Sequence, residues 1–575
     1  MVRYPLPFPD QSQAEAGERV NNDAEQAALD LANRFWEHLL EEEPLLGTEV
    51  GDERFDDRLP DPSEEGLNRQ QQLYQGALNE AQTIDRGSLS EDARTSLDIL
   101  EAIARRELDN IKYRLDRITA VMHLYGPSNL LADIGSLQRA DTPDRVDRLV
   151  GRYAAFPKYM EEVSRVALQG AEQGPRMPRL IVDRTIGQVE RLLAGRLEDS
   201  PGMQPAADAS PDDRERVLGA IREYVWPAYS RFLEALREYA PAAPDTIGLH
   251  AQKDGEAMYA ARIRAYTTLP LEPQRIHELG VEDLAKIQQE RREIAERLGF
   301  PDAVTAVEAH TASGRNRASS REEMVRIVED QVNRSWEAAP RFFGRLPKAN
   351  CTVRAVEEFR ERDMPGAFYQ PPTADGSRAG IYYVNASDLD ERPLHHTATT
   401  SYHEANPGHH FQLSIEIEFA DRPALRRFGG FLAGSAFIEG WGLYSERLAD
   451  EMGLFLDDYE RLGMLEAQGH RAARLIVDTG IHAFGWDRDR SIKQMVETGT
   501  PPVDAEIEVD RYIAWPGQAL AYKIGQFEIQ RWREQASQRE GSEFSLRHFH
   551  DRLLALGSLP LASLEREVAN GKRGT

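Results

Sequence analysis

The chain has very little cysteine and no long apolar segment. Cys351 is the single cysteine among 575 residues, so no internal disulfide can form. No run of about 18 apolar residues occurs, which argues against a membrane-spanning helix. The first residues also lack the apolar core of a secretion signal. These absences favour a cytoplasmic protein, because cysteines stay reduced in that compartment.

An excess of positive charge is also missing. The sequence carries 70 basic and 97 acidic side chains, for a formal net charge of −27. Such a surface repels phosphates, so we expect neither a nucleic acid nor a membrane as a partner. The contents of 41% hydrophobic and 29% charged residues are those of a globular protein. The oligomeric state stays open at this level.

Helical patterning covers most of the chain. Apolar residues recur at three- and four-residue steps in segments rich in Ala, Leu, Glu and Arg. These segments are residues 24–44, 64–84, 90–118, 143–170, 210–240, 272–299 and 320–345. Proline and glycine cluster between them, and residues 199–212 are the best candidate linker. We therefore expect a mainly α fold, built as a large multi-helix body.

The proline- and glycine-rich breaks also suggest how this body is divided. We expect an N-terminal extension over residues 1–23, an N-terminal helical region over 24–200 and a middle helical region over 201–345. The remaining residues, 346–575, form the expected catalytic region. We interpret these regions as parts of one continuous fold.

Strand character is found in one region, just before the most distinctive motif. Residues 351–359 alternate crudely, and residues 380–385 (GIYYVN) are a short β-branched and aromatic run. They predict a small antiparallel sheet beside the site. Its edge could bind an extended peptide by strand addition, with Tyr382, Tyr383 and Asn385 as candidate substrate contacts. The alternative is an ordinary hairpin that packs on helices.

The most distinctive segment is His403 to His410 (HEANPGHH). It nearly matches the HExxH motif of zinc hydrolases, in which two histidines hold the metal and the glutamate activates water. Here the fifth position is Pro407, and histidines follow only at the seventh and eighth positions. Residues seven apart on a regular helix are about 10 Å apart, too far to hold one ion. A bulge or break at Pro407-Gly408 would bring His409 to the expected place, with His410 as a close alternative.

A third ligand is available about 30 residues downstream. Residues 437–446 (FIEGWGLYSE) place Glu439 and Glu446 seven apart, on one face of a helix. A catalytic zinc needs three protein ligands and a nearby carboxylate, so this helix could complete the site. The alternative for the whole cluster is a helix start with Pro in its first turn and surface histidines.

Two further sets of polar residues have open interpretations. Arg474, Asp478 and His482 share a helix face, where they could bind a substrate carboxylate or form an internal ion network. His395 and His396, like His470, are interpreted as structural or surface residues.

The motif and its surroundings resemble the bacterial domain-of-unknown-function 885 family, whose hallmark is HExxPGHH. The resemblance continues through residues 437–441, 474–482 and 515–525 and covers the chain from about residue 24 to 569. This family is similar to the gluzincin zinc metallopeptidases, whose third ligand is a glutamate on a later helix. The resemblance therefore implies a metallopeptidase-like body and a Zn²⁺ cofactor.

Roles for single residues follow from this resemblance. It implies zinc ligands at His403, His409 and Glu439, with Glu404 as the base that activates water. Tyr522 would be a transition-state donor. His410 would hydrogen-bond the reacting carbonyl if it is not itself a ligand. Glu446 and Asp478 would support the ligands. For Tyr522 the alternative is a buried side chain that packs between helices.

The sequence thus predicts a zinc-dependent peptidase that cleaves oligopeptides. One alternative is a zinc hydrolase that acts on a small non-peptide amide or an ester. The other is a binding protein with a vestigial metal site, although the retained Glu404 argues against it.

Overall fold

The computed structural model describes residues 11–356, 361, 366–372 and 378–570. The first half holds the helices α1 (Gln11–Glu42), α2 (Pro44–Val50), α3 (Glu64–Ala81), α4 (Glu91–Lys112), α5 (Asp116–Thr119), α6 (Leu130–Leu137), α7 (Pro143–Ala154), α8 (Phe156–Gln173), α9 (Arg179–Ala194), α10 (Pro211–Ala220), α11 (Trp226–Tyr239), α12 (Gly255–Thr267), α13 (Pro273–Leu298), α14 (Ala303–Ala312) and α15 (Arg321–Ala338). Three strands follow, namely β1 (Cys351–Ala355), β2 (Ala367–Gln370) and β3 (Gly380–Val384).

The second half is again helical. It comprises α16 (Thr397–Glu404), α17 (His409–Ile417), α18 (Ala424–Phe428), α19 (Gly430–Ala433), α20 (Ser435–Glu451), α21 (Asp458–His482), α22 (Arg488–Glu497), α23 (Pro502–Ala514), α24 (Ala521–Glu540), α25 (Leu546–Leu556) and α26 (Leu561–Asn570). The prediction of a mainly α fold is therefore confirmed.

All seven predicted helical segments contain helix, but their ends differ. Residues 143–170 divide into α7 and α8 at Ala155, and residues 210–240 contain a π-helical turn, Ile221–Val225, between α10 and α11. The candidate linker 199–212 includes a 3-10 helix, Pro201–Ala206, that packs on α6 with Gly202 buried. Tertiary packing thus orders this Pro/Gly-rich segment.

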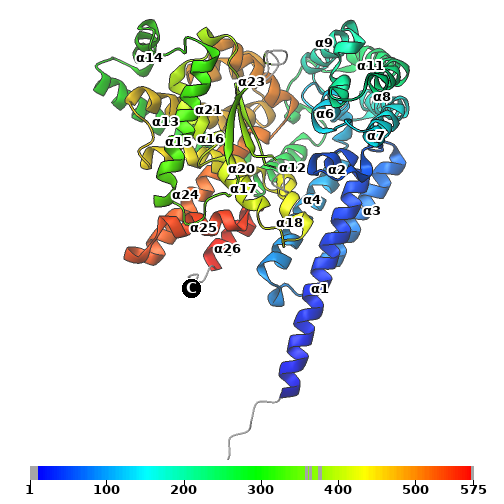
Figure 1. Cartoon of the computed structure of the whole chain (residues 1–575), viewed down its shortest axis with the longest axis horizontal. Helices are drawn as coiled ribbons and strands as arrows, with labels where there is room; N and C mark the ends of the chain where they lie inside the picture. The colour runs from blue at the N-terminus through cyan, green and yellow to red at the C-terminus, as the bar shows by residue number, and fades with distance from the viewer. Residues whose placement is uncertain (1–10, 357–360, 362–365, 373–377, 571–575) are drawn as a thin grey trace, which may run out of the picture.

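The elements form two groups of helices around the short sheet (Figure 1). Helices α6–α9 and α11 lie together on one side, while α13, α15, α21 and α24–α26 lie on the other. One large apolar core extends through both groups, with buried members from Ala28 to Val568. The N-terminal end of α1 projects beyond the body. No helix in the described part of the chain is long and apolar enough to cross a membrane.

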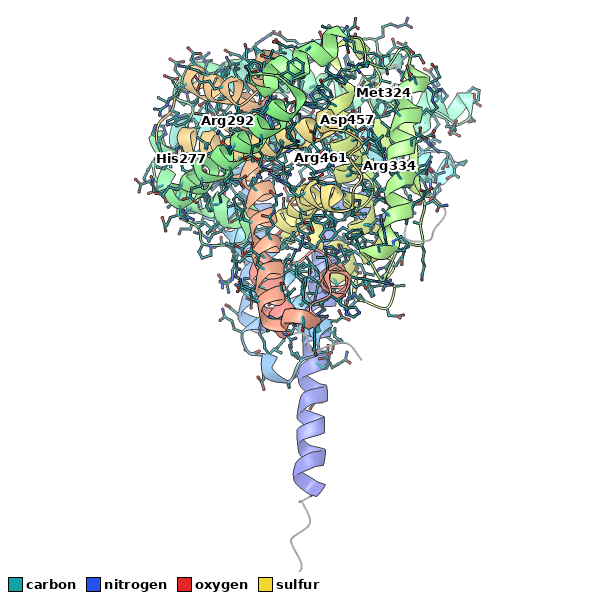
Figure 2. The ribbon with its side chains drawn as sticks, turned by 90° about the vertical axis from the view of Figure 1, so that its left-hand side faces the viewer. His277, Arg292, Met324, Arg334, Asp457 and Arg461 are labelled. Atoms are coloured by element: carbon teal, nitrogen blue, oxygen red, sulfur yellow. The ribbon has the colours of Figure 1, made fainter. Side chains whose placement is uncertain are left out.

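A side view shows the face formed by α13, α21 and α15 (Figure 2). α13 and α21 pack against each other, and α16 lies in contact with both α15 and α21. Asp457 caps the N-terminus of α21, and its side chain accepts hydrogen bonds from the backbone N–H groups of Tyr459 and Glu460. The labelled residues lie on α13 (His277, Arg292), at the start of α21 (Asp457, Arg461) and on α15 (Met324, Arg334).

The sheet differs from the predicted antiparallel one. Its strand order is β1-β3-β2, with β1 and β3 parallel and β2 and β3 antiparallel, so the sheet is mixed. The strand β2 was not predicted, and residues 357–359 of the predicted first strand lie outside the described residues. β3 is the central strand and buried along its length. The prediction that Tyr382, Tyr383 and Asn385 occupy an edge strand is therefore wrong.

Glycines allow three helices of the second half to approach closely. A Cβ atom on Gly525 of α24 would lie 1.7 Å from the carbonyl oxygen of Ala436 on α20, and one on Gly440 would lie 2.4 Å from the carbonyl carbon of Gly525. α20 also contacts α16, where a Cβ atom on Gly442 would lie 2.7 Å from Nε2 of His403. The backbone of α20 is thus in direct contact with both neighbours.

This close packing predicts a large cost for one added methyl group. We expect Gly525→Ala to lower the free energy of unfolding by about 1–3 kcal/mol, because α20 and α24 must move apart. The matched control is Gly76→Ala on α3, where an added Cβ meets no atom within 4 Å and should stabilise the helix by about 0.5–1 kcal/mol. Equal stability of the two variants in urea unfolding would contradict the packing argument.

Candidate metal centre

The HEANPGHH segment folds as two helices with a break between them. α16 ends at Glu404 and α17 begins at His409. Ala405 leaves the helical conformation with φ −99° and ψ −105°, and the Asn406–Pro407 peptide bond is cis. The predicted break at Pro407-Gly408 is therefore present.

Neighbouring side chains hold the break in place. The indole N–H of Trp441 donates a 2.9 Å hydrogen bond to the carbonyl oxygen of Pro407, and the hydroxyl of Ser445 donates to the same oxygen at 3.3 Å. The hydroxyl of Ser335 donates to the carbonyl of Asn406 at 2.8 Å. A Cβ atom at Gly408 would lie 1.8 Å from the carbonyl oxygen of His403, so this position requires glycine.

The break brings His403 and His409 to one point on α20. Nε2 of His403 and Nε2 of His409 each lie 3.8 Å from Oε2 of Glu439. The two imidazole rings meet edge to face, with 4.8 Å between their centroids. All three ligand atoms lie within 4.8 Å of one another. We call His403, His409 and Glu439 the metal cluster.

A buried chain of hydrogen bonds orients His403. Its Nδ1 lies 2.8 Å from Oε1 of Glu446, which leaves Nε2 directed at Glu439 and His409. The amide of Gln468 donates to the other oxygen of Glu446 at 2.9 Å, and Nζ of Lys523 donates to the amide oxygen of Gln468 at 2.8 Å. A carboxylate on the far nitrogen of a histidine fixes its tautomer and strengthens it as a ligand.

The electrostatic field of the metal cluster favours a cation. Burial opposes charge on His403, yet the carboxylates of Glu439 and Glu446 raise its pKa to about 10. Burial and the charge on His403 lower the pKa of His409 to about 4, so its imidazole is neutral near pH 7. Burial raises the pKa of Glu439, but interactions with the two histidines outweigh it and lower the value to about 2.

Two predicted catalytic residues lie on elements beside the metal cluster. Burial raises the pKa of Glu404, as do the charges of Glu439 and Glu446, while His403 and Arg471 oppose the shift. Tyr522 lies on α24, one turn before Gly525, the contact point with α20. Its ring is covered by the guanidinium of Arg474 at 4.6 Å, and its hydroxyl makes no hydrogen bond within the described residues.

His410 does not join the metal cluster. Its Nδ1 lies 2.8 Å from the hydroxyl of Tyr369 on β2, and its Nε2 lies 3.0 Å from the carbonyl of Ala349. Because a carbonyl can only accept, Nε2 donates and Nδ1 accepts. The structure thus directs His410 towards the sheet and uses both of its nitrogens there.

The predicted substrate contacts on β3 lie in different surroundings. Tyr382 is buried against α16, where its phenol hydrogen-bonds Ser401. The negative charge of Glu404 contributes to the raised pKa of this phenol. Tyr383 lies on the opposite face of the sheet and stacks on Phe368. Asn385 is fully buried and accepts a hydrogen bond from Ser387. Of the three, Tyr382 alone faces the helix that carries Glu404.

Arg474, Asp478 and His482 take part in internal hydrogen bonds. Arg474 donates to Glu508 at 2.9 Å and to the hydroxyl of Tyr512 at 3.1 Å. Asp478 accepts hydrogen bonds from the hydroxyl of Tyr259 and the N–H of Gly517. His482 accepts from the N–H of Leu249 and donates to the carbonyl of Tyr512. This arrangement matches the internal network that the sequence left open as one alternative.

Sequence reasoning missed several residues near the metal cluster. Arg471 contributes positive charge to both Glu404 and Glu446, and Arg511 does so to Glu439. Gln468 and Lys523 complete the chain that orients His403. The spacing of Gln468, Arg471 and Arg474 on one helix is the signal that could have identified the α21 members.

A second group of possible metal ligands consists of His395, His396 and Glu466. Nε2 of His395 and Nε2 of His396 lie 3.0 Å and 2.6 Å from the same oxygen of Glu466. The other oxygen of Glu466 is 3.1 Å from the guanidinium of Arg291. Both oxygens of the Glu466 carboxylate therefore have partners within the protein. This agrees with the expected structural role of the two histidines.

Comparisons with known proteins cover nearly the whole chain. The family described as a bacterial protein of unknown function, DUF885, matches residues 44–568. A solved structure described as a putative lipoprotein from Colwellia psychrerythraea is 26% identical, with a TM-score of 0.88 over 95% of this chain and 99% of that one.

A second solved structure shares the fold. It is described as a putative lipoprotein of unknown function from Shewanella oneidensis and is 19% identical. The TM-score is 0.74, and the match covers 94% of this chain and 99% of that one. No curated protein matches the chain.

The positions of the two neighbouring histidines predict different effects on zinc binding. We expect the wild-type chain to retain zinc during dialysis against a weak chelator and His409→Ala to lose it, because one of the three candidate ligands is removed. His410→Ala is the matched control and should retain zinc, since that imidazole faces the sheet. Elemental analysis measures both variants. The reverse pattern would exclude the metal cluster as defined.

Proposed function

The chain belongs to the DUF885 family of bacterial proteins, and we propose that it is a zinc-dependent hydrolase that cleaves peptide bonds. In this proposal its body is metallopeptidase-like and similar to that of the gluzincins. The observation that carries the proposal is the convergence of two histidine nitrogens and one glutamate oxygen beside a half-buried glutamate, Glu404. The expected cytoplasmic location also stays a prediction.

The metal cluster fits a catalytic zinc ion. Zinc bonds of roughly 2.0–2.2 Å place tetrahedral ligand atoms about 3.3–3.6 Å apart, close to the 3.8 Å separations between Glu439 and each histidine. Three protein ligands leave a fourth position for water, as in catalytic sites. Gly442 lacks the Cβ atom that would otherwise contact Nε2 of His403. The ligands would be His403, His409 and Glu439.

The protein groups would then act as follows. A bound zinc ion supplies a Lewis acid that polarises a carbonyl and acidifies a water molecule. Glu404 accepts the proton of that water and returns it to the leaving amine. Its raised pKa brings it closer to the operating range of a general base. Glu446 keeps His403 in the required tautomer.

Tyr522 is the candidate donor to the oxygen of the reacting carbonyl. Its hydroxyl makes no hydrogen bond within the described residues, and the guanidinium of Arg474 covers its ring. A neighbouring positive charge favours a phenol that donates strongly. We assign no catalytic role to His410, because both of its nitrogens have protein partners.

The decisive test separates metal binding from catalysis. We expect Glu404→Gln to retain zinc and to lower peptide hydrolysis by about 10²–10⁴-fold, since the amide keeps its size but cannot accept the proton. Cleavage of a peptide library, followed by mass spectrometry, measures the activity. Elemental analysis measures the zinc content.

Two controls complete this experiment. Glu41→Gln changes an exposed glutamate on α1, remote in sequence from the metal cluster, and should leave both measurements unchanged. Small N-acyl amines, assayed in parallel, test the non-peptide alternative. Near-normal turnover of Glu404→Gln would exclude the proposed mechanism, and no hydrolysis of any substrate by the zinc-loaded wild type would exclude the function.

A further inference from the structure

A large cavity lies among the N-terminal helices, apart from the metal cluster. Its volume is about 800 Å³, within the range of sites for small organic ligands. Helices α1–α6 supply most of its wall. The rest comes from α12, Leu432 of α19, the end of α23 with the two residues after it, and the segments 176–178 and 247–252. None of the metal-cluster residues lines it, nor does Glu404 or Tyr522.

Most of the wall is apolar or aromatic. Leucine and isoleucine side chains come from α1, α2, α4 and α5, and aromatic rings come from several elements. Tyr125 and Trp515 lie with their ring centroids 4.8 Å apart, and Tyr266 meets Trp515 edge to face. Such a wall would bury the hydrocarbon part of a ligand, and its rings can attract a cation.

Three carboxylates on this wall have no partner. They belong to Glu43 at the junction of α1 and α2, Glu49 on α2 and Asp133 on α6. Within the described residues, no hydrogen bond or ion pair reaches any of these side chains. Glu43 and Asp133 are half-buried and Glu49 is exposed, so all three carboxylates are accessible to a ligand in the cavity.

The positive groups of the wall are engaged elsewhere. Arg106 donates to Glu107 at 2.7 Å and also hydrogen-bonds the carbonyl of Leu432. Arg262 donates to the hydroxyl of Tyr266 at 2.6 Å and lies over its ring. A third guanidinium, that of Arg176, bonds the carbonyl of Ala242. Each guanidinium therefore has a partner within the protein, whereas the described residues give the three carboxylates none.

The titration of these carboxylates agrees with this arrangement. Burial, together with the charges of Glu107 and Glu42, raises the pKa of Glu43 to about 8, against the opposing charge of Arg106. Burial and the charge of Glu49 raise the pKa of Asp133 to about 6. Partial desolvation raises the pKa of Glu49 as well. A bound cation would favour the ionised carboxylates and so displace protons.

We propose that this cavity binds an organic cation, namely a primary ammonium or guanidinium group carried on a hydrocarbon chain. The apolar wall accommodates the chain, and Glu43, Glu49 and Asp133 receive the charged group. A small inorganic ion would leave the apolar wall without a partner. The same chemistry is found in free alkylamines and in the basic side chains of peptides.

Calorimetric titration of the full-length protein tests the charge requirement. The probes are n-hexylamine, 1-hexanol and hexanoate, which share a chain length and differ in charge. We expect hexylamine to bind at least about tenfold more tightly than hexanol and hexanoate not to bind, because only the cation compensates the carboxylates. Equal affinity for hexylamine and hexanol, or no binding of hexylamine, would overturn the proposal.

A second arm distinguishes the two sources of the cation. The peptide Ala-Lys-Ala is compared with Ala-norleucine-Ala, which has a similar side chain without the ammonium group. The Glu404→Gln variant is used, so that hydrolysis does not consume the peptides. Binding of the lysine peptide in preference to its neutral analogue assigns the cavity to peptide side chains. If hexylamine alone binds, the ligand is a free amine.

Variants locate the site within the wall. Glu43→Gln should weaken hexylamine binding at least about tenfold, and Asp133→Asn provides a second, independent variant. Glu41→Gln, an exposed neighbour on α1, is the control and should bind as the wild type does. Unchanged affinity in both wall variants would overturn the assignment of the carboxylates.

The pH dependence of hexylamine binding tests the role of the carboxylates without a variant. Because the cation binds the ionised carboxylates, its affinity should rise as pH increases through about 6 to 8 and then level off. An affinity independent of pH over this range would contradict the role of Glu43. These measurements do not involve the metal cluster, so His409→Ala should bind hexylamine normally even if the proposed hydrolase function fails.

Discussion

Backbone contact between α20 and its two neighbours is the constraint on which the candidate metal centre depends. Gly440 meets Gly525 of α24, and Gly442 meets the imidazole of His403 on α16. A Cβ atom at either position would clash with these neighbours, so the helices would have to move apart. Because Glu439 and Glu446 lie on the same helix as these glycines, the contact places both carboxylates against the histidines.

The break between α16 and α17 is the second requirement, and α20 supports it too. Trp441 and Ser445 of this helix donate hydrogen bonds to the carbonyl of Pro407, a group that the broken helix leaves without a partner. One helix therefore supplies the acidic member of the candidate metal centre, the carboxylate that orients His403 and the donors that hold the break. The local interruption and the long-range packing are thus coupled.

The sheet contacts residues of both α16 and α17. β2 and the segment before β1 bind both nitrogens of His410 through Tyr369 and Ala349, so the second histidine of the pair is fixed away from His409. β3 places Tyr382 against α16 near Glu404. The sheet therefore acts as a buried support for the site, and its central strand offers no free edge for a peptide.

The sequence by itself determined the helical character of the chain, the break at Pro407-Gly408 and the identity of the ligand types, because periodicity, proline and motif spacing act locally. Only the tertiary structure decided which histidine meets Glu439, since His409 and His410 are adjacent and the contacts made by distant Tyr369 and Ala349 separate them. The mixed sheet and the network around Arg474 likewise depend on residues far apart in the chain. Pairing between strands and burial of charge are long-range properties, which local patterns do not encode.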